Sequence, residues 1–150
     1  MIKKTFLVGC VAAAVMLTGC ASVKMESASA DLARKEFKAP APDMSAVYIY
    51  RDGVLGAALK KDIRVDGRLI GESAPNTYFF VELTPGPHTL ATESEFSDNE
   101  LLLEAEAGKN HFVEQYIRMG AFVGGANLRI VSEETGKAGV RSTKLASPVQ

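Results

Sequence analysis

Short runs in which apolar and polar side chains alternate fill the middle of the chain, and turn residues separate them. An apolar residue at every second position places the apolar side chains on one face of a strand, so each run predicts a half-buried strand. The runs lie at 47–50, 62–65, 77–83, 88–92, 100–107, 111–119 and around Leu128 and Ile130. This spacing is typical of an all-β, small antiparallel β-sandwich. Nine of the eleven aromatic residues fall between Tyr48 and Phe122, which places the core there and the domain at 45–145.

The turn residues predict how the strands pair. Asp66–Gly67 is a two-residue hairpin signal, because glycine tolerates positive φ and the aspartate can bond the local backbone. With that turn, Ile63 is expected opposite Ile70. We also expect each of the next two pairs of strands to form a hairpin. The pairs are 77–83 with 88–92, across a proline turn, and 100–107 with 111–119, about Gly108–Lys109.

The C-terminal region predicts little regular structure beyond a short helix. Residues 120–126 are glycine-rich and read as a flexible connection. Ser132 precedes two acidic residues, which is typical of a helix start, since its hydroxyl can cap free amides and the acids face the positive end of the helix dipole. Gly136 and Gly139 argue against a long helix, and residues 146–150 are expected to be a tail.

The first twenty residues predict export. Two lysines precede an uncharged stretch at 5–18, which is long enough for a signal-peptide core and short for a spanning helix. The stretch ends in Leu17–Thr18–Gly19–Cys20, which resembles the bacterial lipobox. That resemblance implies cleavage between Gly19 and Cys20 and acylation of Cys20, with palmitate among the fatty acids. Residues 1–19 are thus predicted to be a lipoprotein signal peptide; the alternative is an N-terminal membrane anchor with incidental cysteines.

The predicted cleavage also sets the location and the redox state. Cys10 leaves with the signal peptide, so the mature domain has no thiol pair for a disulfide. The residue after the cysteine is Ala21. It is not the aspartate that resembles the inner-membrane retention signal of enterobacterial lipoproteins. In a Gram-negative host, this favours a protein of the cell envelope that is lipid-anchored in the outer membrane and faces the periplasm.

Residues 20–44 are expected to form a lipidated tether. Alanine, serine and charged residues give a solvated chain, and Pro40 and Pro42 stiffen its end. A short helix at 30–38 is the alternative.

Composition and charge exclude several classes of partner. The 150 residues are 47% hydrophobic and 23% charged with a formal net charge of −1, which fits one globular domain with accessory segments. A balance of 17 basic and 18 acidic residues gives no electrostatic reason to expect nucleic acid. Two cysteines and two histidines cannot furnish a four-ligand zinc site without carboxylates, so we expect neither a metal nor another cofactor.

The sequence offers few residues for catalysis, and we expect none. The only histidine bases are His88 and His111, and no G-x-S-x-G or phosphate-binding glycine loop is present. The sulfur of Cys20 would already be bonded to lipid. The acidic residues between Glu93 and Glu106 read as a solvated surface. One alternative is a metal site of both histidines in which Glu104 or Glu106 reaches His111; another is a histidine–acid pair that hydrolyses envelope material.

A binding surface is the remaining candidate. If Val47 and Ile49 face the core, Tyr48 and Tyr50 face outward beside Arg51, and such residues favour interfaces. Replacing Tyr50 and Arg51 with alanine would then weaken binding without changing thermal unfolding. The alternative is a strand buried on both faces. The apolar loop at 53–59 either covers an edge of the sandwich or meets a partner.

The same residues carry a family resemblance. The motifs are Tyr48–Ile49–Tyr50–Arg51, Val65–Asp66–Gly67 with Ile70–Gly71, Thr77–Tyr78–Phe79, Pro85–Gly86–Pro87–His88–Thr89, and Ala107–Gly108–Lys109 with His111–Phe112–Val113. Together, over 46 to about 135, they resemble the bacterial domain-of-unknown-function family 2846 and are similar to PEGA surface modules. The resemblance implies an immunoglobulin-like or prealbumin-like β-sandwich on a bacterial lipoprotein and no established activity. Phe79 and Phe112 depart from it, since tyrosines are common at those positions.

These observations predict a non-catalytic, lipid-anchored envelope protein whose sandwich binds another envelope component, a protein rather than a glycan. Two alternatives stay open: an envelope hydrolase that uses a histidine–acid pair, and a passive structural lipoprotein without a ligand. No residue pattern indicates an oligomeric state.

Overall fold

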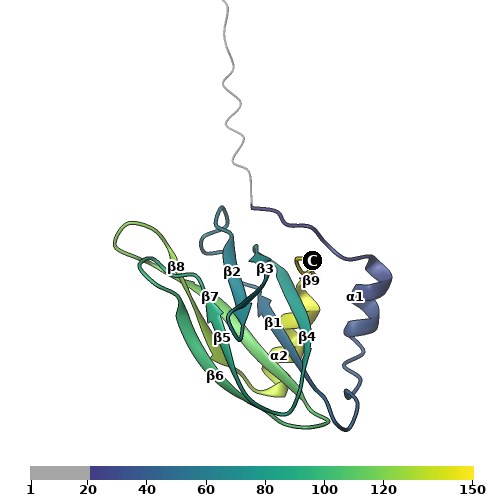
Figure 1. Ribbon diagram of the computed structural model, residues 1–150. Coiled ribbons are helices and arrows are strands. Elements are labelled where there is room, and N and C mark those ends of the chain that lie inside the picture. The colour runs from purple at the N-terminus through teal and green to yellow at the C-terminus, as the bar shows by residue number, and fades with distance from the viewer. Residues whose placement is uncertain (1–20) are drawn as a thin grey trace, which may run out of the picture.

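Two packed β-sheets and two short helices build the fold in the computed structural model, which describes residues 21–150 (Figure 1). The predicted signal peptide at 1–19 and the predicted acylation site at Cys20 lie outside the described residues. The elements in chain order are α1 Ala28–Arg34, β1 Ser45–Arg51, β2 Lys61–Val65, β3 Arg68–Ser73, β4 Thr77–Leu83, β5 Gly86–Thr92, β6 Asn99–Ala105, β7 Asn110–Arg118, β8 Gly125–Ile130, α2 Glu133–Ser142 and β9 Lys144–Leu145. Neither helix of this part of the chain has the length and apolar character needed to cross a membrane.

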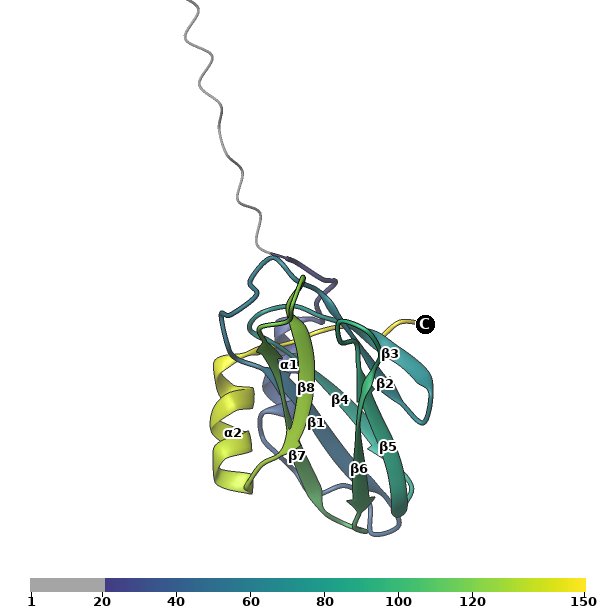
Figure 2. The same ribbon diagram turned by 90° about the vertical axis from the view of Figure 1, so that its left-hand side faces the viewer.

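The strands form the predicted sandwich. One sheet has the order β8-β7-β1-β4-β9 and the other β3-β2-β5-β6. Figure 2 shows the two layers, with α2 on the outer side of the sheet that contains β1. The all-β class and the short C-terminal helix are therefore confirmed. The first sheet is mixed, because β1 runs parallel to β7 and β4 parallel to β9, where the sequence predicts an antiparallel sandwich.

Alternation along the strands creates the core between the sheets. Side chains at every second position of β1 and β2 turn inward and meet those of the strands that flank and face them. The buried members of this cluster are Val47, Ile49, Ile63, Val65, Phe79, Leu90, Leu103, Val113, Leu128 and Ala146. Apolar burial of this kind is the dominant stabilising term for a domain that has no disulfide.

A second apolar cluster covers the outer face of the first sheet. It contains Phe37, Ala46, Tyr48, Tyr50, Tyr78, Phe112, Val140 and Leu145. The helix α2 supplies Val140, and its N-cap Ser132 accepts a hydrogen bond from the Thr135 amide at 3.3 Å, as the sequence predicts. The helix runs for ten residues through Gly136 and Gly139, which are buried against the sheet. As a result, β1 is buried on both faces.

Residues 21–44 fold onto the domain, so the prediction of a solvated tether is corrected for this segment. The alternative of a short helix is closer, since α1 spans Ala28–Arg34. Met25 forms a β-bridge with Ala146, and Phe37 is buried in the second cluster. The buried ring of Phe37 and the pairing of Met25 beside the edge strand β9 hold the segment against the domain. The C-terminal tail is held as well, because the Val149 amide donates to the Ile70 carbonyl at 2.8 Å.

Two predicted hairpins are wrong. The strands β4 and β5 lie in different sheets, as do β6 and β7. The proline turn and the Gly108–Lys109 turn therefore carry the chain from one sheet to the other. A short turn is compatible with a hairpin within one sheet and with a crossing between the two sheets. The pairing that forms is the one that buries the apolar faces of the strands.

The Asp66–Gly67 hairpin is confirmed. Asp66 and Gly67 have φ of 50° and 78°, the positive values that a two-residue turn between strands requires. The register differs from the expectation: Ile63 lies opposite Gly71, and the pairing shifts between Ile63 and Arg64. A β-bulge of this kind adds one residue to one strand, which explains the offset.

Candidate functional site

The three residues predicted to form an exposed binding surface are buried, so that prediction is corrected. Tyr48, Tyr50 and Arg51 are 2%, 2% and 1% exposed. The ring of Tyr48 stacks on Phe112 with centroids 5.2 Å apart, and its hydroxyl donates to the Arg34 carbonyl at 3.0 Å. Burial raises the pKa of Tyr50 to about 12, so its phenol stays neutral. The alternative reading of a strand buried on both faces is the correct one.

The guanidinium of Arg51 organises the loop that follows β1. It donates to the carbonyls of Leu59 and Gly56, both at 2.8 Å, and to that of Leu55 at 3.4 Å. Burial lowers the pKa of Arg51. Three carbonyl dipoles thus take the place of a carboxylate partner around this cation. The hydrogen bonds from the buried Arg51 guanidinium therefore fix the conformation of the apolar loop at 53–59.

His88 is bonded at both ring nitrogens. Its Nδ1 lies 2.6 Å from Asp66 Oδ2, and its Nε2 lies 2.8 Å from the Thr84 carbonyl oxygen. Both neighbours are acceptors, so an imidazolium that donates twice fits this setting. The hydrogen bond to Asp66 is the main reason that the pKa of His88 is raised, and the same bond lowers the pKa of Asp66. A ring without a free lone pair cannot take a proton from a nucleophile.

His111 stands in a different setting. Its Nε2 accepts a hydrogen bond from the Glu106 amide at 3.0 Å. A metal ligand would need that lone pair, because Nδ1 of a neutral ring carries the proton when Nε2 accepts, and it would need other donors nearby. Between residues 21 and 150, no group of three or more His, Cys, Asp or Glu side chains comes together to hold a metal. The alternative that joins His111 to Glu104 or Glu106 is not assembled.

Several acidic side chains of the β5–β6 region have structural partners. Glu93 forms an ion pair with Lys61 at 3.6 Å, and Asp98 one with Arg64 at 3.7 Å. Glu95 accepts hydrogen bonds from the amides of residues 121–123. These contacts fasten loops and neighbouring strands, which is a structural use of carboxylates.

A buried polar group that the sequence analysis missed links the two sheets. Gln115 of β7 donates through Nε2 to the Thr92 hydroxyl of β5 at 2.7 Å, and the Ser73 hydroxyl of β3 donates to Gln115 Oε1. Thr92 in turn donates to the Asp62 carbonyl at 2.9 Å. The signal was present, because Gln115 occupies an inward position between Val113 and Ile117. These polar atoms satisfy one another, so the group fixes the alignment of the sheets.

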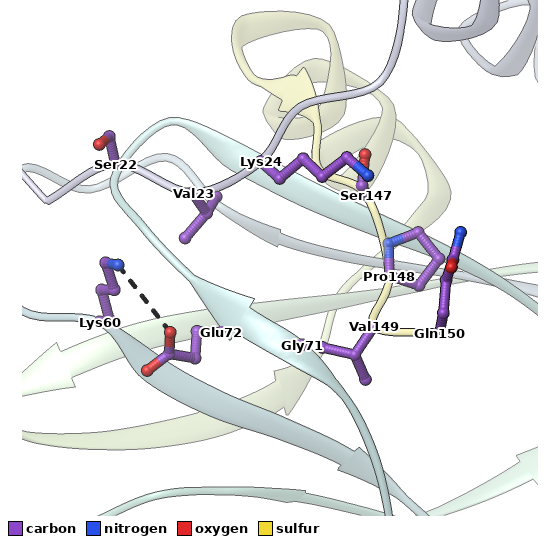
Figure 3. A pocket seen from close by; sticks show the side chains of 10 residues that line it. All are labelled: Ser22, Val23, Lys24, Lys60, Gly71, Glu72, Ser147, Pro148, Val149 and Gln150. Carbon is purple, nitrogen blue, oxygen red and sulfur yellow. Dashed lines mark ion pairs between the residues drawn. The ribbon is translucent and has the colours of Figure 1, made fainter.

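A cleft lies where the first described residues and the C-terminal residues pass β3, as Figure 3 shows. It has a volume of about 620 Å³. Residues 22–24 form one wall, residues 147–150 another, and Gly71 and Glu72 of β3 a third. Lys60 lies across from Glu72, with 3.9 Å between the ammonium and the carboxylate. A neighbouring hollow of about 430 Å³ continues along β3 toward β4 and is more apolar.

The cleft is lined by polar side chains of several kinds. Its polar side chains are exposed ammonium, carboxylate, hydroxyl and amide groups, and neither histidine lines it. β3 is an edge strand whose far side faces the cleft and the hollow beside it, where the C-terminal tail donates one backbone hydrogen bond to it, from Val149. An edge strand with a cleft beside it is the geometry that accepts an extended chain.

Comparisons with known proteins identify the family. The family model described as "Protein of unknown function (DUF2846)" matches residues 41–126. A protein of Haemophilus influenzae, described as an uncharacterized protein, is 46% identical over 133 residues, which cover 89% of this chain and 79% of the relative. No solved structure matches the chain. Because the matched region takes in β1 through the start of β8 and more than half of the chain, the chain belongs to the DUF2846 family.

Proposed function

We propose that the protein is a lipid-anchored component of the bacterial cell envelope, held in the outer membrane through Cys20 and facing the periplasm, and that its sandwich is a non-catalytic binding module. The observation that carries this proposal is the order of features at the N-terminus. A charged start, an apolar stretch and the sequence Leu17–Thr18–Gly19–Cys20 come directly before the folded domain.

The position of Ala21 supports the same proposal. Its amide donates to the Ala57 carbonyl at 3.0 Å, so the described chain meets the domain at the residue after Cys20. An acylated Cys20 would hold the sandwich directly at the membrane surface. A module at that position can act on neighbouring envelope components without diffusing away.

The cleft beside β3 is where we place the partner, and the partner we favour is an extended segment of another envelope protein. Such a segment would add main-chain hydrogen bonds to β3 and place alternate side chains into the apolar hollow. Glu72 and Lys60 at the rim would then contribute to specificity more than to affinity. We place the binding site at this edge and not at the tyrosines of β1, because those tyrosines are buried.

The setting of the histidines favours a binding module over an envelope hydrolase. Both nitrogens of His88 are bonded to acceptors, and His111 accepts a backbone hydrogen bond. Neither ring is arranged with a nucleophile, which a hydrolase of this kind needs.

The anchor is tested by the intact mass of the protein extracted from the envelope of a Gram-negative cell. Loss of residues 1–19 with a mass gain of fatty acyl chains on the new N-terminus is the expected result. A Cys20→Ser variant should lack both changes. Wild-type protein without acyl mass would contradict the anchor.

The binding module is tested in the same cells by photo-crosslinking from an unnatural amino acid at Glu72. A single abundant protein adduct is expected from Glu72 and not from Lys109, which is exposed on the turn between β6 and β7. No adduct from either position, with an active probe, would favour the passive structural lipoprotein.

A further inference from the structure

Large apolar side chains are exposed in three loops of the sandwich. The loop between β1 and β2 exposes Val54 and Leu55, that between β5 and β6 exposes Phe96, and that between β7 and β8 exposes Met119, Phe122 and Val123. Phe96, Met119 and Phe122 are more than 80% exposed. Single exposed apolar residues are ordinary on protein surfaces, but a group of them indicates a surface that contacts something apolar.

Contacts between the loops bring this group together at one end of the molecule. The carboxylate of Glu95, in the β5–β6 loop, accepts the amide of Ala121 at 2.7 Å and that of Val123 at 3.2 Å. Leu59, at the end of the β1–β2 loop, lies close to Gly124 at the end of the β7–β8 loop. All three loops lie at the upper end of the sandwich in Figures 1 and 2. We call these three loops the apolar end.

The N-terminal segment reaches the domain at the same end. Ala21 donates to Ala57 within the β1–β2 loop, and the chain enters the domain at the top of both views. Cys20 directly precedes Ala21 in the sequence, and consecutive Cα atoms are about 3.8 Å apart. Fatty acyl chains on Cys20 would thus begin within a few ångströms of the loop that exposes Val54 and Leu55.

We infer that the apolar end is a membrane-docking surface: its three loops insert into the same lipid leaflet that holds the acyl chains of Cys20. The inference rests on the proposed lipid anchor and adds the orientation of the domain. The sandwich stands on the bilayer with its strands directed away from it. The turns at Asp66–Gly67 and Gly108–Lys109 then point away from the membrane.

Backbone chemistry at the loop tip fits an apolar environment. Unpaired backbone amides are costly to move out of water. In the β7–β8 loop, Glu95 accepts the amides of Ala121, Phe122 and Val123, the residues at the tip. The backbone of the tip can therefore reach headgroup depth with these amides bonded to the Glu95 carboxylate, while the side chains of Phe122 and Val123 extend toward the acyl chains.

The charges of the loops decide how the docking depends on lipid composition. The β7–β8 loop carries no charged residue between Met119 and Gly124, the β5–β6 loop carries acids only, and the β1–β2 loop carries Asp52 and Lys60. The surface therefore lacks the basic cluster that binds anionic headgroups. Apolar burial drives the contact, whereas anionic headgroups repel the acids of the loops. Anionic lipid is therefore expected to weaken the contact, and added salt is expected to reduce that repulsion.

The test uses the acylated protein in vesicles of phosphatidylethanolamine and phosphatidylglycerol. The sulfur of Cys20 is bonded to lipid, so a cysteine introduced by Phe122→Cys is the only free thiol for an environment-sensitive fluorophore. A second sample carries Lys109→Cys at the opposite end. We expect spin-labelled lipids to quench the probe at 122 and not the probe at 109. Equal quenching by an aqueous quencher at both positions would overturn the inference.

Matched variants separate the loops from other apolar residues. Phe96→Ser and Met119→Ser are each expected to reduce lipid quenching of the probe at 122 by about half or more. Leu102→Ser removes a side chain that is 68% exposed on β6, away from the loops, and should leave the quenching unchanged. Self-quenching between probes at 122 without lipid quenching would instead mean that a second copy covers the apolar end.

Intact mass on the same sample keeps this inference distinct from the anchor. Acylated protein whose probe at 122 stays in water would retain the anchor and overturn the docking surface. Protein without acyl chains would overturn the anchor. The probe would then be placed at 122 in a chain with Cys10→Ser and Cys20→Ser, where it is again the single thiol, and its quenching on added vesicles would support or overturn the docking surface by itself.

Discussion

Gly139 of α2 lies directly against the ring of Tyr50 in β1. A Cβ atom at Gly139 would come within 2.1 Å of Tyr50 Cε2, and one at Gly136 within 2.1 Å of Phe112 Cβ. Carbon atoms that are not bonded stay about 3.5 Å apart or more. The two glycines therefore let the helix approach the sheet, and the closed face of β1 depends on them.

Replacing Gly139 with alanine is expected to destabilise the fold. In an exposed helix the same change would stabilise by about 1 kcal/mol, whereas overpacking here should cost about 1–3 kcal/mol. The sign thus separates packing from helix propensity. Urea unfolding of residues 20–150 with Cys20→Ser measures it, and Gly53→Ala is the control, since nothing lies within 4 Å of an added Cβ there. An unchanged or raised midpoint for Gly139→Ala would contradict the packing.

Arg51 should behave as a core residue in spite of its charge. Arg51→Ala removes hydrogen bonds to the carbonyls of Leu59, Gly56 and Leu55 and opens a cavity, so we expect a loss of about 2–4 kcal/mol. Arg51→Lys should recover little of it, because an ammonium cannot fork between carbonyls as a guanidinium does. Thermal unfolding is the measurement, with the exposed Arg68→Ala as the control. An unchanged unfolding temperature for Arg51→Ala would show that Arg51 does not contribute to the core.

His88 and Asp66 predict a stability that depends on pH. The pKa of His88 is raised above 6.5, so its contribution is complete below that value and is lost as the pH rises through the raised pKa. The pKa of Asp66 is lowered below 3.8, so its contribution is present above that value and is lost as the pH falls through the lowered pKa. The pair stabilises most between 3.8 and 6.5.

The variant His88→Gln makes this dependence measurable. Half of the Asp66 side chain is exposed, so solvent screening keeps the effect at about 1 kcal/mol or less. We expect the difference in unfolding free energy between wild type and variant to be largest near pH 5 and to shrink toward pH 9. A difference that is constant across that range would show that the ion pair does not contribute.

The strands could be predicted from the sequence more readily than their partners. Alternation locates β4 at 77–83 because each strand carries its own pattern of burial. Pairing depends on elements far apart in the chain, such as the parallel contact of β1 with β7. No local signal marks that contact, and a turn at Gly108–Lys109 is compatible with a hairpin or with a crossing between sheets. Burial of the apolar faces of β6 and β7 decides between the two, and this burial depends on the whole fold.

The misplaced binding site has a specific cause. Tyr48 and Tyr50 face away from the inner core, as the alternation predicts, but Phe37, α1 and α2 cover them. A segment interpreted as a tether and a helix expected to be short supply that cover. The apolar loop at 53–59 was visible in the sequence, yet only the fold shows that it meets two further loops with exposed apolar side chains at the end where the chain enters.

Asp31 joins α1 to the C-terminal segment, and its loss is expected to release the N-terminal segment from the domain. Its carboxylate accepts the Leu145 amide at 3.1 Å and the Lys35 ammonium at 2.9 Å. Burial alone would raise the pKa of Asp31, but the bonds from Lys35 and other donors bring it below 3.8. The carboxylate therefore stabilises above that pH and fails as the pH falls through the lowered pKa.

Asp31→Asn should cost about 1–3 kcal/mol, because it removes the counter-charge of the partly buried Lys35 ammonium. We expect hydrogen exchange to rise at 25–37 and 144–147 while β2, β5 and β6 keep their protection. Glu36→Gln removes an exposed ion pair with Lys38 and serves as the control. If the segment is released, the folded domain gains a flexible linker to Cys20, and lipid quenching at Phe122 should fall although acylation persists. Unchanged exchange at 25–37 would show that the β-bridge and Phe37 hold the segment without Asp31.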